Sequence, residues 1–221
     1  MSDIQITATL KDQVYQIIKM RIIEQYYKPG QWLQENDVAT QLNVSRSPVR
    51  AALKSLVHDG LVIELPNKGV FVREFSPQDI RDIFDMRSMM ESYAITSSPK
   101  NLQSAITETL NSLIAQLVET NRQEDLNHYI KFDTKLHDTI IELGGNVLLS
   151  STYHQLRSML QPFRVYSLLG KERFDASVEE HRSIVSCICR GDIEKAIQEN
   201  KQHLTLARDA ILSYLASKEK K

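Results

Sequence analysis

One aspartate and three histidines in the C-terminal part of the chain have residue types that bind metal ions. Asp133 and His137 lie four residues apart, so on a helix both side chains project from one face, one turn apart. His181 and His203 follow, each in a different predicted helix. Three imidazoles and one carboxylate would leave one or two positions of an octahedral ion for a ligand carboxylate. On spacing alone, the alternative is an Asp–His pair that is solvated or hydrogen-bonded and binds no metal.

A second set of residues has the types that bind DNA. The formal net charge of the chain is -1, but residues 43–58 contain Arg46, Arg50 and Lys54 and no acidic residue. Such a local basic patch, rather than the overall charge, is what phosphate binding requires. A guanidinium can donate two hydrogen bonds to O6 and N7 of guanine, so Arg46 and Arg50 are predicted to read bases.

Apolar periodicity and turn residues predict the elements that carry these basic side chains. The predicted elements are, in order, helices over residues 9–26, 34–42 and 45–60 and strands over residues 61–65 and 70–73. Pro29-Gly30 ends the first helix, and Ser45 is a good N-cap for the third. Three helices followed by a hairpin form a winged helix-turn-helix, in which the third helix enters the major groove with its N-terminus first.

This layout assigns further residues to the DNA contact. Ser45 and Ser47 lie at the N-terminal end of the third helix, where hydroxyls and backbone amides suit phosphate. Lys68 and Gly69 lie in the turn between the two predicted strands. This turn, the wing, could lie against the neighbouring minor groove or the DNA backbone.

After Ser76-Pro77 no strand pattern recurs, and helical periodicity predicts an all-helical second domain. The six predicted helices span residues 77–97, 101–120, 123–143, 146–169, 174–190 and 192–217. Helices of that length can form one antiparallel bundle, and facing helices of bundles commonly build metal sites. The sequence therefore predicts a mainly α chain with a winged helix-turn-helix over residues 1–73, a linker over 74–79 and a six-helix antiparallel bundle over 80–221.

Composition and motifs exclude several classes of protein. No apolar run approaches the roughly 20 residues that span a bilayer, and the N-terminus lacks a signal-peptide pattern, so a cytoplasmic protein without membrane contact is expected. Cys187 and Cys189 would point about 200° apart on a helix and are expected to be reduced. No nucleophile elbow, phosphate loop or zinc-protease motif is present, so no catalytic residue is predicted. A hydrolase that activates water at the four metal-ligand candidates is a remote alternative.

The N-terminal domain carries a spaced pattern that is more specific than a generic helix-turn-helix. It includes Pro29-Gly30, Leu33, Glu35, Val38-Ala39, the run from Leu42 to Arg50, Ala52-Leu53, Gly60-Leu61-Val62 and Phe71-Val72. Over residues 10–73 this pattern closely resembles the DNA-binding domain of the GntR family of bacterial regulators. The resemblance implies that Arg46 and Arg50 meet guanines in a palindromic operator and that the chain works as a homodimer. Asn36 stands where the family commonly has an arginine, so one base or phosphate contact is expected to be shorter or lost.

The second domain carries a family pattern of its own. It consists of Phe132-Asp133-x3-His137, Glu180-His181-Arg182-x-Ile184, Gly191-Asp192 and His203-Leu204. From about residue 76 to residue 215 it looks like the FCD sensor domain of the FadR subfamily of GntR regulators, and six helices look like its VanR-type group. The metal ligands that the resemblance implies are Asp133, His137, His181 and His203. The implied cofactor is one divalent transition-metal ion per chain. Imidazole and carboxylate together suit zinc, nickel, manganese or iron, and zinc or nickel is the expected ion.

The first helix of the second domain supplies a candidate for effector binding. Arg87-x3-Glu91 is similar to the Arg-x2-Leu-Glu element of the family, which implies that Arg87 pairs with the carboxylate of an organic-acid effector. An ion pair between Arg87 and Glu91 on one helix is the alternative. Arg157 and Arg164 on a later helix are weaker candidates.

Together these patterns predict a one-component transcription repressor. A small organic acid bound at the metal site would alter helix packing and the angle between two DNA-binding domains, so that half-site spacing no longer matches. The alternative within the same class is a metal-responsive regulator in which the ion itself is the signal.

Overall fold

The computed structural model describes residues 9–98 and 104–219. The chain divides into two compact units. They consist of Met1–Phe75 with Gln155–Pro162 and of Ser76–His154 with Phe163–Lys221.

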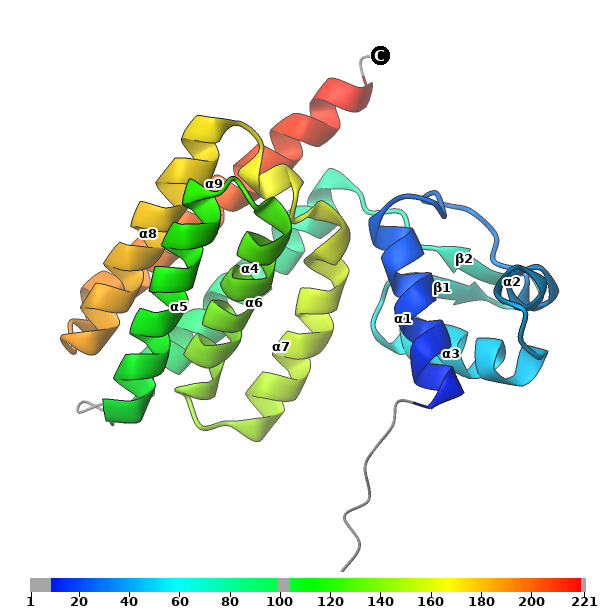
Figure 1. The fold of residues 1–221 in the computed structure, drawn as a ribbon, viewed down its shortest axis with the longest axis horizontal. Helices are drawn as coiled ribbons and strands as arrows, with labels where there is room; N and C mark the ends of the chain where they lie inside the picture. The colour runs from blue at the N-terminus through cyan, green and yellow to red at the C-terminus, as the bar shows by residue number, and fades with distance from the viewer. Residues whose placement is uncertain (1–8, 99–103, 220–221) are drawn as a thin grey trace, which may run out of the picture. The chain divides into compact units, whose positions relative to one another are not determined.

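The first unit contains three helices and a hairpin in the predicted order (Figure 1). The elements are α1 (Leu10–Ile23), α2 (Glu35–Leu42), α3 (Arg46–His58), β1 (Val62–Leu65) and β2 (Gly69–Val72). α1 begins after a capping box, in which the Thr9 hydroxyl accepts from the Asp12 N–H and the Asp12 carboxylate accepts from the Thr9 N–H. α1 packs on α3, and Ile18, Val49 and Leu56 are fully buried in the shared core. The unit is therefore a winged helix-turn-helix.

A tight turn between α2 and α3 sets the start of α3. Asn43 lies in the left-handed region with φ 51°, and its N–H reaches the carbonyls of Ala39 and Thr40. Asparagine tolerates this conformation better than most residues, so it ends α2 sharply. Ser45 then lies in extended conformation at the N-cap of α3, as predicted, and Arg46 begins the helix.

The wing pairs with a segment that the sequence pattern did not predict as extended. In the hairpin, Val62 lies opposite Val72 and Leu65 opposite Gly69. An isolated bridge joins Trp32 to Phe71. A single bridging residue has no alternating pattern, so periodicity could not indicate it.

After residue 75, the described residues form six α-helices and two 3₁₀ turns (Figure 1), all in the second unit except residues 155–162. They are α4 (Pro77–Thr96), α5 (Ser104–Arg122), α6 (Leu126–Glu142), α7 (Val147–Leu160), η1 (Gln161–Phe163), η2 (Tyr166–Leu168), α8 (Lys171–Cys189) and α9 (Ile193–Glu219). α4 begins inside the segment predicted as a linker, because Ser76 forms a capping box with Asp79. The prediction of a mainly α chain, with an N-terminal winged helix-turn-helix and a helical C-terminal domain, is confirmed.

The predicted helix over residues 146–169 is wrong after residue 160. α7 ends at Leu160, and two 3₁₀ turns follow. Pro162 explains the break, because proline lacks an N–H and its ring clashes with the preceding turn of a helix. As a result Arg164 lies in a connection rather than on a helix. The predicted helix over residues 101–120 begins with residues 101–103, which lie outside the described residues.

The core of the second unit has an apolar part and a polar part. α5 packs on α6 and α8, while α9 packs on α4 and α8. The fully buried apolar side chains include Leu110, Leu117, Leu136, Ile140, Ile184 and Ala196. Polar side chains from α4, α6, α8 and α9 are buried as well, and Glu91, His137, His181 and Asn200 are all 0 % exposed. Buried polar groups are costly unless they are hydrogen-bonded, so this polar part needs an explanation.

No helix in the two described ranges combines the length and the apolarity needed to cross a membrane. Cys187 and Cys189 are both free thiols. Burial raises the pKa of the Cys189 thiol, which reduces the fraction of reactive thiolate.

Replacing Leu117 by alanine tests the apolar core away from the polar part. Leu117 on α5 is 0 % exposed, so Leu117→Ala should lower the free energy of unfolding by about 2–5 kcal/mol. Leu148→Ala is the matched control, since Leu148 is 78 % exposed and its truncation should change stability by less than about 0.5 kcal/mol. Urea unfolding of metal-free protein, followed by circular dichroism, measures both. Equal effects of the two substitutions would contradict this description of the core.

Candidate functional site

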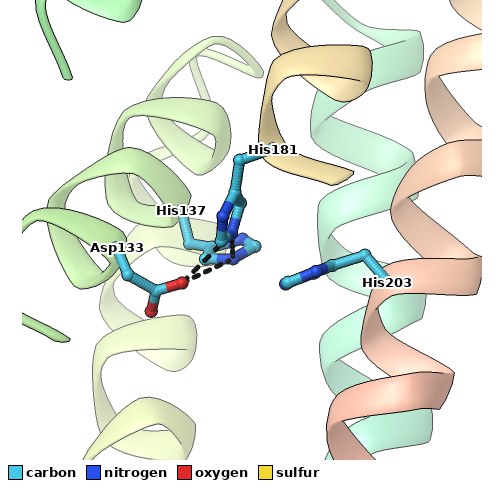
Figure 2. Close-up of side chains that lie close together, drawn as sticks. All are labelled: Asp133, His137, His181 and His203. Atoms are coloured by element: carbon cyan, nitrogen blue, oxygen red, sulfur yellow. Dashed lines mark hydrogen bonds and ion pairs between the residues drawn. The ribbon is translucent and has the colours of Figure 1, made fainter. Parts of the chain in front are cut away.

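Asp133, His137, His181 and His203 meet inside the second unit (Figure 2). α6 carries the first two, α8 carries His181 and α9 carries His203. One ligand atom from each residue lies within 4.8 Å of those of the other three, and no imidazole is more than 4 % exposed. All four residues that the sequence singled out as metal-ligand candidates are thus brought together.

The ring nitrogens and the carboxylate face one another closely. His137 Nε2 and His181 Nε2 are 3.3 Å apart. Asp133 Oδ1 lies 3.1 Å from His181 Nε2 and 3.7 Å from His137 Nε2. The His203 ring centroid is 5.3 Å from that of His137 and 4.4 Å from that of His181. A carboxylate with several imidazole nitrogens at such separations is a donor set that suits a shared transition-metal cation.

The other nitrogen of each imidazole has a partner on a neighbouring helix. The three Nδ1 pairs are His137 with Glu91 Oε2 at 3.0 Å, His203 with Glu180 Oε2 at 2.7 Å and His181 with the Tyr129 hydroxyl at 3.3 Å. A carboxylate beside Nδ1 accepts the Nδ1 proton, so Nε2 keeps a free lone pair. In His137 this tautomer turns the Nε2 lone pair toward His181 and Asp133.

Glu91 on α4 is the most connected of these partners. Its carboxylate accepts hydrogen bonds from Arg87 Nε at 2.8 Å, from the Tyr153 hydroxyl at 2.8 Å and from Asn200 Nδ2 at 2.9 Å, in addition to its contact with His137. Burial acts to raise the pKa of Glu91, but its contact with His137 and the guanidinium charge of Arg87 outweigh burial and lower the pKa well below its ordinary value. Glu91 therefore stays ionised while fully buried.

Arg164 holds the carboxylate of Asp133. Its Nη1 binds Asp133 Oδ2 and donates to the Thr134 hydroxyl at 2.8 Å. Burial acts to raise the pKa of Asp133, and Arg164 with His181 lowers it well below its ordinary value. Oδ2 is thus occupied and Oδ1 faces the imidazoles. Sequence reasoning placed Arg164 among the weaker effector candidates, because the break in the helix that directs it to Asp133 was not predicted.

Two of the imidazoles, those of His137 and His203, are held in their neutral form. Burial, together with the charge of Arg87, lowers the pKa of His137 below its ordinary value. Burial and the neighbouring imidazoles lower the pKa of His203 well below its ordinary value. Neutral imidazole is the form that binds metal ions, so the lowered pKa values of His137 and His203 favour the metal-binding form of these two side chains near pH 7.

Each acidic group of the cluster is paired with its own arginine. The pairs are Arg87 with Glu91, Arg164 with Asp133 and Arg173 with Glu180, the last through two contacts of 2.9 Å. Three carboxylates and three guanidiniums balance, so with neutral imidazoles the cluster carries no net charge. Sequence reasoning missed Glu91 and Glu180 as partners of the histidines, and Arg173 as the partner of Glu180. The one sign of these partners in the sequence was Glu180, which directly precedes His181.

Arg87 forms the ion pair that was the alternative to effector binding, and it retains a further donor. Its Nε binds Glu91, while its buried Nη2 has no hydrogen-bond partner among the described residues. Asn200 Oδ1 is also buried without a partner in this part of the chain. Native proteins rarely leave buried polar atoms unpaired, and such atoms often mark where a ligand binds.

In the first unit, the two predicted base-reading arginines share one acidic partner. Glu35 Oε1 and Oε2 accept from Arg50 Nε and Nη2, both at 2.8 Å, and Oε2 also accepts from Arg46 Nη2 at 3.3 Å. The side chains of Arg46 and Arg50 remain 57 % and 54 % exposed. The hydrogen bond from Arg50 lowers the pKa of Glu35. Sequence reasoning gave Glu35 no role, because its contact with α3 depends on the turn between α2 and α3.

The remaining DNA-binding candidates fall into two groups, and all of them are exposed except Gly69, which is half-buried. Asn36 and Gly69 border the same hollow as Arg46 and Arg50, which has a volume of about 350 Å³. Ser45, Ser47 and Lys68 are exposed and do not border that hollow. The Ser45 hydroxyl makes no capping hydrogen bond to α3, so it is available to another acceptor or donor.

Both units match known protein families. Residues 10–72 match the model of the bacterial regulatory proteins of the gntR family. Residues 82–206 match the model of the FCD domain, which covers more than half of the chain.

Individual relatives agree with these matches. The transcriptional regulator YdhC of Bacillus subtilis (strain 168) is 27% identical over 197 residues, which are 87% of this chain and 84% of YdhC. The gluconate operon transcriptional repressor of the same organism is 25% identical over 199 residues, 88% of this chain and 82% of the repressor. A GntR transcriptional regulator from Rhodococcus sp. RHA1 has the same fold, with a TM-score of 0.74 at 24% identity, covering 92% of this chain and 97% of that one.

These relatives are regulators of transcription, so the hydrolase alternative falls and the chain is not an enzyme. The matches to both parts also agree with the order of the two units along the chain. The chain therefore belongs to the GntR family of bacterial regulatory proteins and is a DNA-binding transcriptional regulator with a C-terminal FCD domain.

Proposed function

We propose that this regulator is a repressor controlled by a small organic anion that binds at a divalent metal ion in the FCD domain. The observation that carries the proposal is the buried cluster of Asp133 with three imidazoles from three helices. The relative that represses a gluconate operon supports the repressor role. We further propose the FadR subfamily and its VanR-type group, with a DNA-binding domain over residues 1–73, a linker over 74–79 and a sensor domain over 80–221.

The residues of the cluster fit a metal ion in both donor type and protonation. Nitrogen and oxygen donors in this combination favour zinc or nickel, and we propose one ion per chain. The ion would supply positive charge and coordination positions that an anion can fill. The chain's own contribution is orientation: Glu91 and Glu180 set the tautomers of His137 and His203, and Arg164 fixes the carboxylate of Asp133.

The charge balance of the cluster specifies the effector more closely. Because three carboxylates and three guanidiniums already cancel, a divalent cation would leave about two positive charges in a buried region. Uncompensated buried charge is costly, so an effector with two negative charges is favoured over one with a single charge. The unpartnered Nη2 of Arg87 is the donor that would bind one of its carboxylates.

The coupling to DNA follows from where the cluster lies. Its residues and their partners come from α4, α6, α8 and α9, so a ligand there can change how these helices pack. In a homodimer on a palindromic operator, such a change would alter the spacing of the two DNA-binding domains. The alternative in which the ion alone is the signal predicts that metal changes operator affinity without any organic anion.

Metal content of the purified protein tests the cluster directly. Wild-type protein should carry about one zinc or nickel ion per chain, while His137→Ala and His203→Ala should carry almost none, because each removes a ligand. His128→Ala is the control, since the side chain of His128 is 61% exposed and lies outside the cluster. Elemental analysis after incubation with either metal gives the answer. Full metal content in both ligand variants, or none in wild type, would refute the site.

Exchanging Glu180 for glutamine tests how the histidines are oriented. Glu180→Gln replaces the charged acceptor of the His203 Nδ1 proton by a neutral amide, which accepts more weakly and can present its NH2 group instead, and should weaken metal binding by about 10–100-fold. Glu179→Gln is a neighbouring control, because the Glu179 side chain is 69% exposed and pairs with Arg182. Competition with a chromogenic chelator measures both affinities. The same affinity for the two variants would show that Glu180 does not position His203.

Thermal shifts of metal-loaded protein with a carboxylate series test the effector class. Dicarboxylates should raise the Tm more than monocarboxylates of similar size, because they cancel the excess charge. Arg87→Lys should reduce the shift while keeping one positive charge, since lysine lacks the second donor of the fork. A larger shift with monocarboxylates, or an undiminished shift in Arg87→Lys, would count against this assignment.

A further inference from the structure

Trp32 occupies an unusual place for a large aromatic side chain. It is the single tryptophan of the chain, and it is 51 % exposed. It directly precedes Leu33, which is buried and whose N–H donates to the Val70 carbonyl at 2.8 Å. The backbone at Trp32 is thus fixed while half of the indole surface remains in solvent. Tryptophan rings usually bury most of their large apolar area, so the exposed half is available to a partner.

The wing holds the indole in a defined orientation. The ring stacks on Phe71 with centroids 6.4 Å apart and planes inclined by 19°. A bridge joins the backbones of the same two residues. Gly69, the first residue of β2, lies so close to the indole that a Cβ there would lie 2.6 Å from the indole Nε1. The indole is therefore placed by a β-bridge, an aromatic stack and the absence of a side chain at position 69.

The same indole borders the hollow that contains the base-reading candidates. Trp32, Asn36, Arg46, Arg50 and Gly69 all line this hollow of about 350 Å³. One wall is thus the N-terminal part of α3 and the other is the wing. In a winged helix-turn-helix these two elements contact adjacent parts of the duplex. A DNA strand that passes between them would face the indole.

We propose that Trp32 packs against deoxyribose groups of the operator strand that lies between α3 and the wing. The exposed indole is apolar and offers no charge to phosphate, whereas the neighbouring arginines do. Sugars are present at every nucleotide, so this contact adds affinity without reading sequence. The inference rests on the proposed binding of DNA by α3 and the wing.

Fluorescence of the single tryptophan gives the first test. The probe is a duplex that wild-type protein has enriched from a random library. On titration with this duplex, we expect a blue shift of the emission and protection from acrylamide quenching, because the indole leaves water. Unchanged emission and quenching in a complex whose formation is seen by anisotropy would overturn the proposal.

Affinity measurements over a series of salt concentrations give the second test. Trp32→Ala should weaken binding of the labelled duplex by about tenfold, because the apolar contact is lost. The slope of log affinity against log salt should stay as in wild type, because no phosphate contact is removed. The affinity of Trp32→Phe for the duplex should lie between those of wild type and Trp32→Ala. Tyr26→Ala is the control, since Tyr26 is 60% exposed and does not border the hollow.

Arg50→Ala separates failure of this inference from failure of the proposed function. If Arg50→Ala weakens binding and Trp32→Ala does not, the arginine role stands and the indole contact is wrong. If neither variant differs from wild type, binding by α3 itself is wrong. A loss in Trp32→Ala that is confined to duplexes with one particular base would also overturn the sugar contact. Should Trp32→Ala fail to fold, Trp32→Phe and the quenching of wild type decide.

Discussion

The polar core of the FCD domain depends on one requirement: each buried imidazole needs a hydrogen-bond partner that fixes its tautomer. An imidazole in a protein core has no water to fix its tautomer, so another residue must accept the Nδ1 proton. Glu91 and Glu180 do this for His137 and His203. Buried carboxylates in turn need counter-charges, which Arg87 and Arg173 provide. The histidines thus require the glutamates, and the glutamates require the arginines. Together these side chains connect α4, α6, α8 and α9.

The sequence predicted the inner layer of this network and not the outer one. Asp133 and His137 were visible because four-residue spacing places both on one face of a helix. Glu91 was not visible as their partner, because it lies 46 residues from His137 and meets it only through the packing of α4 on α6. Arg164 was missed for a local reason, since the effect of Pro162 on the helix around it was overlooked. Residue spacing predicts which side chains share a face of one helix, but it does not predict which side chains on two different helices meet.

The DNA-binding unit shows the same division. The elements and the exposure of Arg46 and Arg50 follow from Ser45 as an N-cap and from the apolar face of α3. Their pairing with Glu35 does not, because it depends on the tight turn at Asn43. This pairing matters for recognition. A base or phosphate that binds these arginines must compete with a carboxylate already in place, so weak or misplaced contacts gain little.

The matched arginine–carboxylate pairs around the histidines have a further consequence. A group of residues that is neutral and hydrogen-bonded by itself does not depend on a cation for its folding, unlike zinc-dependent domains whose ligands repel one another without the ion. Such a protein can persist in the cell with or without metal and exchange between the two forms as supply changes. If the proposed metal ion and organic anion both bind in this domain, gene expression under its control would depend on two inputs, the anion and the metal supply.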